Sequence, residues 1–340
     1  MSSENHVSGD GPAQPDIAII GTSSTVVERE IGRSLEELIF DTSRATLASA
    51  GLTIDDIDSV VLSGNDEIDG RVISIMASSG PSGSVGRDTT MIASAGDHAL
   101  IYGYLRLLAG QGKKVLVLGW AKPSESVSPD HAELVEAEPF LLRQVGMNHT
   151  VAAALLASAL RKPGDALPEG PLVAWPLSRQ ELPARGDSVH GVVLAIDGAF
   201  PDGSELAWIK ATGWATATYE LGDRTLGDFD SLRAALGQVA KRSPEHGPSS
   251  WDAVEIGASS EPAVAAVARS LDASTDLVVN ASGSLSQHPT SPHVAGLSRM
   301  VAAIRAVTKG AGTVAGIGFH GFAGQGATVV VFGSEKGAAS

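Results

Sequence analysis

The sequence predicts an α/β protein made of two similar halves. Short apolar runs that suit buried strands alternate with helical patterns, an order that favours parallel sheet. A Ser-Leu helix start followed by an Asp-x-Val strand occurs twice, from Ser34 to Asp58 and from Ser231 to Asp252, which indicates an internal repeat. With 340 residues, 43% of them apolar, the chain can also fill a sizeable core.

The first half should begin with a buried strand at residues 16–21. A helix follows, because Ser34 and Glu37 have the spacing of a capping box and Gly51 stands where a left-handed residue would end the helix. The remaining elements alternate in the same way. We expect strands at residues 58–63, 89–93 and 114–120, and a mostly apolar helix at 95–109.

The second half repeats this order. We expect a helix from Ser231, strands at residues 252–257, 276–280, 313–318 and 327–332, and a helix at 294–308. The turn before that last helix, residues 284–293, is long and rich in Ser, Pro and His, whereas the first half passes from Ala93 almost directly into its helix. Long polar turns on an α/β scaffold are where sites are usually built.

Four regions are expected along the chain. Residues 1–15 are polar and lack the basic and apolar regions of a signal peptide, so they predict a disordered tail and a cytoplasmic protein. The N-terminal half, 16–121, and the C-terminal half, 202–335, flank residues 122–201, which we interpret as an inserted loop domain with the end of the first half. The acidic stretch at 124–138 is interpreted as a solvated face.

The composition excludes several classes of function. The 39 acidic and 24 basic residues give a net charge of −15, and no basic stretch stands apart, so neither nucleic acid nor an anionic membrane is an expected partner. No apolar run reaches the roughly 18 residues that a membrane span needs. The chain has no cysteine, which excludes disulfides, cysteine-ligated metals and thiol nucleophiles.

The order of several motifs resembles the thiolase superfamily, especially the branch similar to sterol-carrier-protein thiolases and acetyl-CoA acetyltransferases. The resemblance covers about residues 16–333 and rests on the order of short motifs rather than on any one of them. These motifs are Ser34–Gly51 followed by Asp58, Ala93–Gly96, Glu138–Met147, Asn280–Gly283, Gln287–Pro289 and Gly324–Gly326. The resemblance implies a five-layer αβαβα fold and a tight dimer.

The resemblance also implies four catalytic positions, of which only one is unchanged. The family's nucleophilic cysteine lies at the N-terminus of a buried helix, where the helix dipole and backbone N–H groups activate a thiol. The matching residue is Ala93, which cannot attack a thioester. The oxyanion residue matches Gly257, which has no side chain to donate. The histidine of the Gly-His-Pro motif is retained as His288, and the second cysteine, the base in Claisen condensation, is replaced by His320.

Four further residues belong to the thioester pocket that the resemblance implies: Ser94, Gly283, Gly324 and Gly326. Ser94 is next to the position of the lost nucleophile. Neighbouring side chains of a strand-to-helix turn point in different directions, however, so Ser94 is not the expected substitute.

Two interpretations of the histidines stay open. His288 and His320 come from loops that would converge on the family's pocket, and they could act as general acid and base. Alternatively, His288 hydrogen-bonds its own loop and His320 fills the space of a lost thiol. His293 and His190 carry weaker signals, and His190 is interpreted as structural. Since no histidine spacing is typical of a metal site, neither a metal nor a cofactor is expected, and the glycine-rich residues 80–86 are interpreted as a flexible loop.

The sequence therefore leaves two functional hypotheses. In the first, the chain is an enzyme of lipid or secondary metabolism that makes or breaks a C–C bond beside a CoA or carrier-protein thioester. It would do so by Claisen-type acyl transfer or retro-aldol cleavage, without a Cys acyl-enzyme. In the second, it is a non-catalytic subunit that partners a cysteine-bearing paralogue. The resemblance implies a homodimer, or a heterodimer with such a paralogue, and a small zinc-ribbon/OB-fold acyl-CoA-binding protein as a further partner.

Overall fold

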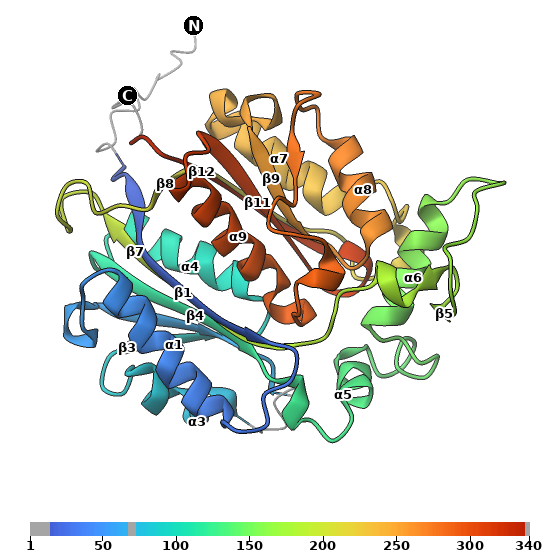
Figure 1. Ribbon diagram of the computed structural model, residues 1–340, viewed down its shortest axis with the longest axis horizontal. Coiled ribbons are helices and arrows are strands. Elements are labelled where there is room, and N and C mark those ends of the chain that lie inside the picture. The colour runs from blue at the N-terminus through green and yellow to red at the C-terminus, as the bar shows by residue number, and fades with distance from the viewer. Residues whose placement is uncertain (1–13, 67–72, 337–340) are drawn as a thin grey trace, which may run out of the picture.

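The computed structural model describes residues 14–66 and 73–336, so most of the predicted tail lies outside the described residues. Ten strands form one continuous sheet, which divides at its middle into two halves of five strands, here called the first and the second sheet (Figure 1). In spatial order, the first sheet contains β3 (Asp88–Ile92), β2 (Ser59–Ser63), β4 (Lys114–Ala121), β7 (Asp187–Ile196) and β1 (Ile17–Val27). The second contains β10 (Val278–Val279), β9 (Ala253–Gly257), β11 (Thr313–His320), β12 (Gly326–Gly333) and β8 (Ala207–Thr216).

The two sheets have the same topology. β2 pairs in parallel with β3 and β4, and the antiparallel strands β7 and β1 follow. In the second sheet β9 pairs in parallel with β10 and β11, and the antiparallel strands β12 and β8 follow. The sheets meet where β1 pairs with β8, at Ala18 with Trp208 and Ile19 with Ala207. The repeat predicted from the spacing of the helix starts and strands is therefore confirmed.

The helices complete five layers, as the resemblance implied. Figure 1 shows α4 (Gly96–Leu108) and α9 (Pro292–Thr308) between the sheets. The outer face of the first sheet carries α1 (Leu35–Ser49) and α3 (Ser74–Ser82), and that of the second carries α7 (Asp230–Arg242) and α8 (Glu261–Ser270). α9 is buried around most of its circumference, because both sheets and α4 pack against it.

The start of α1 forms as its sequence predicts. The backbone N–H of Glu37 donates to the hydroxyl of Ser34 at 3.2 Å, and the N–H of Ser34 donates to the Glu37 carboxylate at 2.7 Å. Gly51 follows the helix in the left-handed region, at φ 66°. Leu35 and Leu38 are then placed against the sheet, and burial of each side chain stabilises the fold by roughly 1.5 to 3 kcal/mol.

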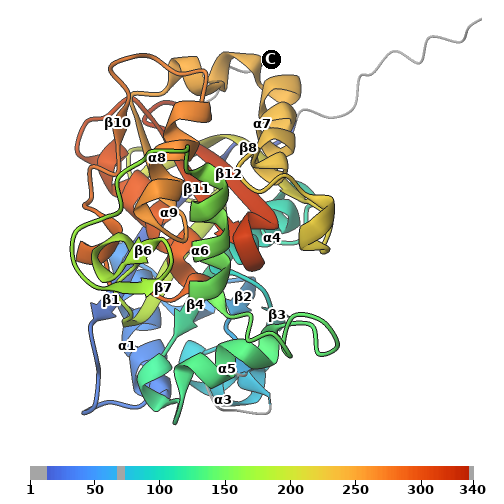
Figure 2. The same ribbon diagram turned by 90° about the vertical axis from the view of Figure 1, so that its right-hand side faces the viewer.

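The segment between β4 and β7 lies at one end of the layered core. It contains α5 (Pro129–Glu136), α6 (His149–Leu160) and a small hairpin of β5 (Leu172–Ala174) and β6 (Leu177–Ser178). Figure 2 shows α5 and α6 on the side that faces the viewer, with the ends of the central strands behind them. Short 3-10 helices are η1 (Ile54–Asp56), η2 (Pro123–Glu125), η3 (Arg179–Glu181), η4 (Leu221–Asp223), η5 (Pro244–His246), η6 (Pro248–Ser250), η7 (Leu285–Gln287) and η8 (Phe322–Gly324).

Three local predictions are corrected. Gly80 lies inside α3 rather than in a flexible loop, because the helix continues to Ser82 and ends at Gly83, which has a left-handed φ of 77°. α9 begins at Pro292, two residues earlier than predicted, since proline is well suited to the first turn of a helix. The acidic stretch is not wholly solvated: Glu133 is buried, because α5 turns that side chain towards the core.

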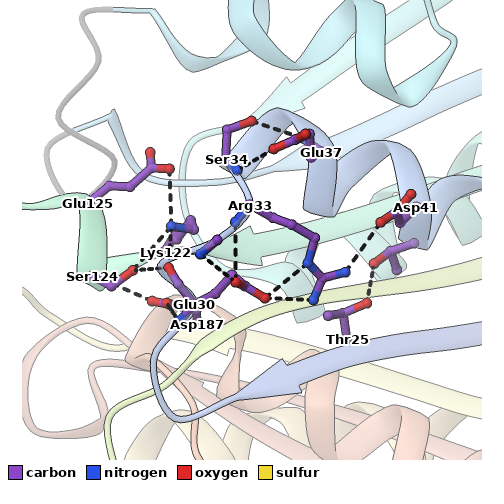
Figure 3. Close-up of polar contacts among 12 residues, drawn as sticks. Thr25, Glu30, Arg33, Ser34, Glu37, Asp41, Lys122, Ser124, Glu125 and Asp187 are labelled. Atoms are coloured by element: carbon purple, nitrogen blue, oxygen red, sulfur yellow. Dashed lines mark hydrogen bonds and ion pairs between the residues drawn. The ribbon is translucent and has the colours of Figure 1, made fainter.

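A polar cluster holds the start of this inserted segment to the first sheet (Figure 3). The buried ammonium of Lys122 donates to the carbonyl of Glu30 at 2.9 Å and lies 3.2 Å from the Glu125 carboxylate. The Asp187 carboxylate accepts hydrogen bonds from the backbone N–H groups of Glu30, at 2.7 Å, and of Ser124, at 3.0 Å. The end of β4, the start of β7 and the loop after β1 are therefore fixed to one another.

In the described part of the chain, no helix combines the length and the apolar character that crossing a membrane requires.

Candidate functional site

A cavity of about 380 Å³ lies where the N-termini of α4 and α9 meet the ends of β9 and β11. The inserted segment closes its other side through α5, α6 and η3. Of the residues singled out from the sequence, Ala93, Ser94, Gly257, His320 and Gly324 line this cavity. The carboxyl ends of strands and the amino ends of helices are where α/β proteins place ligand sites, since backbone N–H groups are free there.

Ala93 and Ser94 form the turn from β3 into α4. Ala93 is exposed to the cavity, and its methyl group offers no nucleophile. The hydroxyl of Ser94 lies 3.0 Å from Nδ1 of His98, one turn along α4. Burial lowers the pKa of His98, so its imidazole is neutral near pH 7 and one ring nitrogen can accept a proton.

Asp97, in the first turn of α4, is a completely buried carboxyl group. Neither of its oxygens accepts a hydrogen bond from any residue in the described ranges. A Cβ at Gly318 would lie 2.5 Å from Oδ2 of Asp97, and one at Gly296 would lie 2.7 Å from Oδ1, so the carboxyl group fits only because both positions are glycine. Burial raises the pKa of Asp97, but attraction to His320 lowers it below its usual range overall, and the N-terminal end of the helix dipole also favours the anion.

His320 ends β11 and lines the cavity next to Asp97, with both ring nitrogens buried and without a hydrogen-bond partner among the described residues. Its Nδ1 lies 3.9 Å from Oδ2 of Asp97, which is an ion-pair distance rather than a hydrogen bond. The imidazole rings of His320 and His98 meet edge to face, with centroids 3.8 Å apart. A Cβ at Gly326 would lie 1.7 Å from Nε2 of His320, so this glycine leaves the space that the imidazole fills. A proton-transfer group and a buried anion thus lie together next to the cavity that Ala93 also lines.

Gly257 is the last residue of β9. A Cβ there would lie 2.9 Å from the carbonyl oxygen of Ala295 in α9. Since real Cβ atoms do not approach a carbonyl so closely, α9 would have to move before any side chain could stand at this position.

A second cluster of ionisable groups also lines the cavity. Nε2 of His149, at the start of α6, is 3.0 Å from one oxygen of Glu136, and Nε2 of His293, in the first turn of α9, is 2.9 Å from the other. Burial raises the pKa of Glu136, but the charge of His293 and hydrogen bonds from both histidines outweigh it and lower the pKa to about 2. The carboxylate is therefore anionic near neutral pH.

Comparisons with known proteins support the same architecture. The sequence matches no protein-family model and no curated protein. The structure of human mitochondrial 3-ketoacyl-CoA thiolase in complex with CoA superimposes with a TM-score of 0.72 at 14% sequence identity, and the match covers 94% of this chain and 98% of that one. A second structure of the human enzyme gives a TM-score of 0.70 at 14% identity, covering 94% and 99% of the two chains. The chain has the thiolase fold.

Within this thiolase fold, the sequence identified some site residues by position and missed others. His288 is not among the residues that line the cavity; it follows η7, and its catalytic role stays a prediction. Gly283 and Gly326 also lie outside the lining. Gly283 accepts a hydrogen bond from the buried Arg299 guanidinium at 2.9 Å, which holds the loop before α9 in place.

The sequence analysis missed Asp97, His98, Glu136 and His149, and it noted His293 without giving it a role. Asp97 carried one usable signal, because a carboxylate in the first turn of an otherwise apolar helix is costly to bury without a partner. The sequence carried no signal for a cluster of Glu136, His149 and His293, since they come from three separate elements that only the fold brings together.

Proposed function

We propose that this cavity binds an acyl thioester and that the chain makes or breaks the C–C bond beside the thioester carbonyl without a Cys acyl-enzyme. The observation that carries the proposal is the position of His320. It lines a cavity at the end of β11, next to the completely buried Asp97 and close to the N-terminus of α4. A histidine backed by a buried anion is suited to take a proton and to keep it as an imidazolium.

The reaction that this arrangement supports best is retro-aldol cleavage of a β-hydroxyacyl thioester. Both ring nitrogens of His320 are buried, so the imidazole must first turn to bring Nε2 to the cavity. His320 then accepts the proton of the β-hydroxyl group, the Cα–Cβ bond breaks, and the aldehyde leaves while the electron pair passes to the thioester as an enolate. The enolate then takes a proton at Cα from His320, which releases a shorter acyl thioester. Backbone N–H groups at the start of α4 would stabilise the enolate oxygen, because the helix dipole favours negative charge there. Asp97 would stabilise the imidazolium formed in the first step.

The substrate handle would be CoA or an equivalent phosphopantetheine carrier. Arg179 is exposed at η3 and lines the cavity, so it offers a positive charge to phosphate groups. We therefore expect Arg179→Ala to raise KM for a CoA thioester and to leave KM for the corresponding pantetheine thioester unchanged, because pantetheine lacks the nucleotide phosphates. Equal changes for both substrates would contradict this assignment.

The test of the reaction uses the purified chain with a panel of β-hydroxyacyl-CoA thioesters. His320→Ala should lower kcat/KM by roughly 100-fold or more, the usual contribution of a general acid or base. His246→Ala is the matched control, because His246 lies in η5 and does not line the cavity. His288→Ala completes the set of variants. If it lowers kcat/KM as much as His320→Ala does, His288 and His320 act together as the acid and base that the sequence predicted. Activity that survives His320→Ala would refute the mechanism.

A second candidate is favoured by the contact between Ser94 and His98. A serine hydroxyl 3.0 Å from an imidazole can be activated as a nucleophile, which would give an oxygen-linked acyl-enzyme. Ser94→Ala distinguishes the two routes, since only the covalent route requires the hydroxyl.

The partner assignments belong to the same proposal: a homodimer, or a heterodimer with a cysteine-bearing paralogue, and a small zinc-ribbon protein as an additional partner. If the isolated chain is inactive and activity returns only when a cysteine-bearing thiolase is added, the chain is a non-catalytic subunit. Copurification followed by the assay above decides between these outcomes.

A further inference from the structure

Glu136, His149 and His293 present three ligand atoms to one point in the cavity. One ligand atom from each residue lies within 4.8 Å of the other two, and all three residues line the cavity wall. They come from the end of α5, the start of α6 and the start of α9, so three elements of the fold converge there. We propose that these residues bind a divalent transition-metal ion of the zinc type.

The donor set and its spacing fit such an ion. Two imidazoles and one carboxylate are a common protein ligand set for catalytic zinc, and the chain has no thiolate to compete with them. Ligands about 2.0 to 2.1 Å from a tetrahedral ion lie about 3.3 Å from one another. The imidazoles contact different oxygens of Glu136, at 2.9 and 3.0 Å, and the three ligand atoms lie within 4.8 Å of one another. Rotation of these side chains, by which one carboxylate oxygen faces both imidazoles, would make room for the ion.

The groups around the ligands support the same assignment. Nε2 of His293 donates to Glu136 in the metal-free chain, and a bound metal would replace that proton. Nδ1 lies 3.4 Å from the carbonyl oxygen of Ser94, a contact that keeps the remaining proton on Nδ1 and leaves the lone pair of Nε2 for the metal. Glu133, one turn before Glu136 on α5, is buried and lines the same cavity. Its Oε2 has no hydrogen-bond partner in residues 14–66 and 73–336, so it is available to accept a proton from a metal-bound water.

The proposed ion would have an open coordination position. Three protein ligands leave at least one position of a tetrahedral site free, and the three residues face the cavity rather than the solid core. That position would take a water molecule or a carbonyl oxygen. The metal site goes beyond the proposed function, which requires only His320 and Asp97 for its proton transfers.

The site can be tested with the metal alone. The full chain, freed of any affinity tag and treated with chelator, is titrated with Zn²⁺ against a chromophoric competitor. Co²⁺ is then added to a second sample, and its visible absorption is recorded. We expect one Zn²⁺ per chain and an intense Co²⁺ spectrum typical of four or five ligands. His149→Ala and His293→Ala should each weaken Zn²⁺ binding by roughly 100-fold or more, because a lost ligand costs at least as much as a lost second-shell partner.

His246→Ala serves as the matched control and should bind Zn²⁺ as the unchanged chain does. Equal affinity in all four proteins, or a weak Co²⁺ spectrum like that of the hydrated ion, would overturn the proposal. If a variant fails to fold, the Co²⁺ spectrum of the unchanged chain still decides, since it depends on the native ligands alone. No acyl thioester enters the experiment, so its failure would not be confused with failure of the proposed reaction.

Discussion

His190 should make the protein sensitive to mild acid. It lies in the middle of β7 with 1% of its surface exposed, and its Nδ1 is 2.9 Å from the hydroxyl of Ser24 in β1. Burial, with smaller contributions from Arg305 and His288, lowers its pKa from 6.5 to about 3. No described residue contacts its Nε2 through a hydrogen bond, so nothing inside the sheet compensates a charge on this ring.

The sign and size of the effect follow from linkage between proton binding and folding. Below pH 6.5 the unfolded chain binds a proton at His190 that the folded chain does not bind until about pH 3. The contribution of neutral His190 to the free energy of unfolding is therefore fully present above pH 6.5 and is lost as the pH falls towards 3. At about 1.4 kcal/mol for each pH unit, protonation of His190 lowers the free energy of unfolding by about 2 kcal/mol between pH 7.5 and pH 5.

Urea titrations at pH 7.5, 6.5 and 5.0 measure this loss. His190→Gln cannot take up the proton, so its free energy of unfolding should fall by about 2 kcal/mol less than that of the unchanged chain over the same range. His131→Gln is the control, because His131 is exposed on α5. The NMR signals of a histidine-labelled sample give a direct check, since the His190 ring should not titrate between pH 8 and pH 5. An equal pH dependence in all three proteins would refute the reasoning.

Three further predictions follow from other parts of the structure. Asp97→Asn keeps the shape of a buried side chain but removes the negative charge next to His320. In steady-state kinetics kcat/KM should fall on the order of 100-fold, while the midpoint of urea denaturation should change little. Lys122→Met should lower the free energy of unfolding by about 2 to 3 kcal/mol in urea, since it removes the buried charged hydrogen bond to the Glu30 carbonyl and the ion pair with Glu125 shown in Figure 3. A loss below about 0.5 kcal/mol would contradict this role. Gly257→Asn should not create an oxyanion site or thiolase activity, because its Cβ would lie 2.9 Å from the carbonyl oxygen of Ala295. We expect this substitution to lower the free energy of unfolding by about 1 to 3 kcal/mol, measured by thermal or urea unfolding.

The fold could be predicted from the sequence because its main signals are local and repeated. The capping box at Ser34, the left-handed Gly51 and the apolar strands each specify an element through neighbouring residues. The repeat then orders these elements into two equivalent sheets. β7 and β8 were not recognised as separate strands, since β7 is buried on both faces and its sequence, which includes Asp187 and His190, lacks the alternation of a half-exposed strand.

The site could be predicted only in part. Ala93, Gly257 and His320 lie in the cavity because their positions follow directly from the ends of β3, β9 and β11, which the repeat had already located. His293 was harder to place than His288, since both belong to one long turn and the start of α9 at Pro292 decides which of them faces the cavity. Convergence of Glu136 with two histidines depends on how α5 and α6 fold over the core, which no local pattern encodes.

The central claim is that the cavity cleaves or forms a C–C bond beside a thioester without covalent capture of the acyl group. The most direct test is a quenched reaction of the chain with a β-hydroxyacyl-CoA, analysed by mass spectrometry for both the small products and the intact protein. The claim predicts an aldehyde and a shorter acyl-CoA in equal amounts, and an unchanged protein mass at every time point. A transient mass increase equal to an acyl group, abolished by Ser94→Ala, would contradict it.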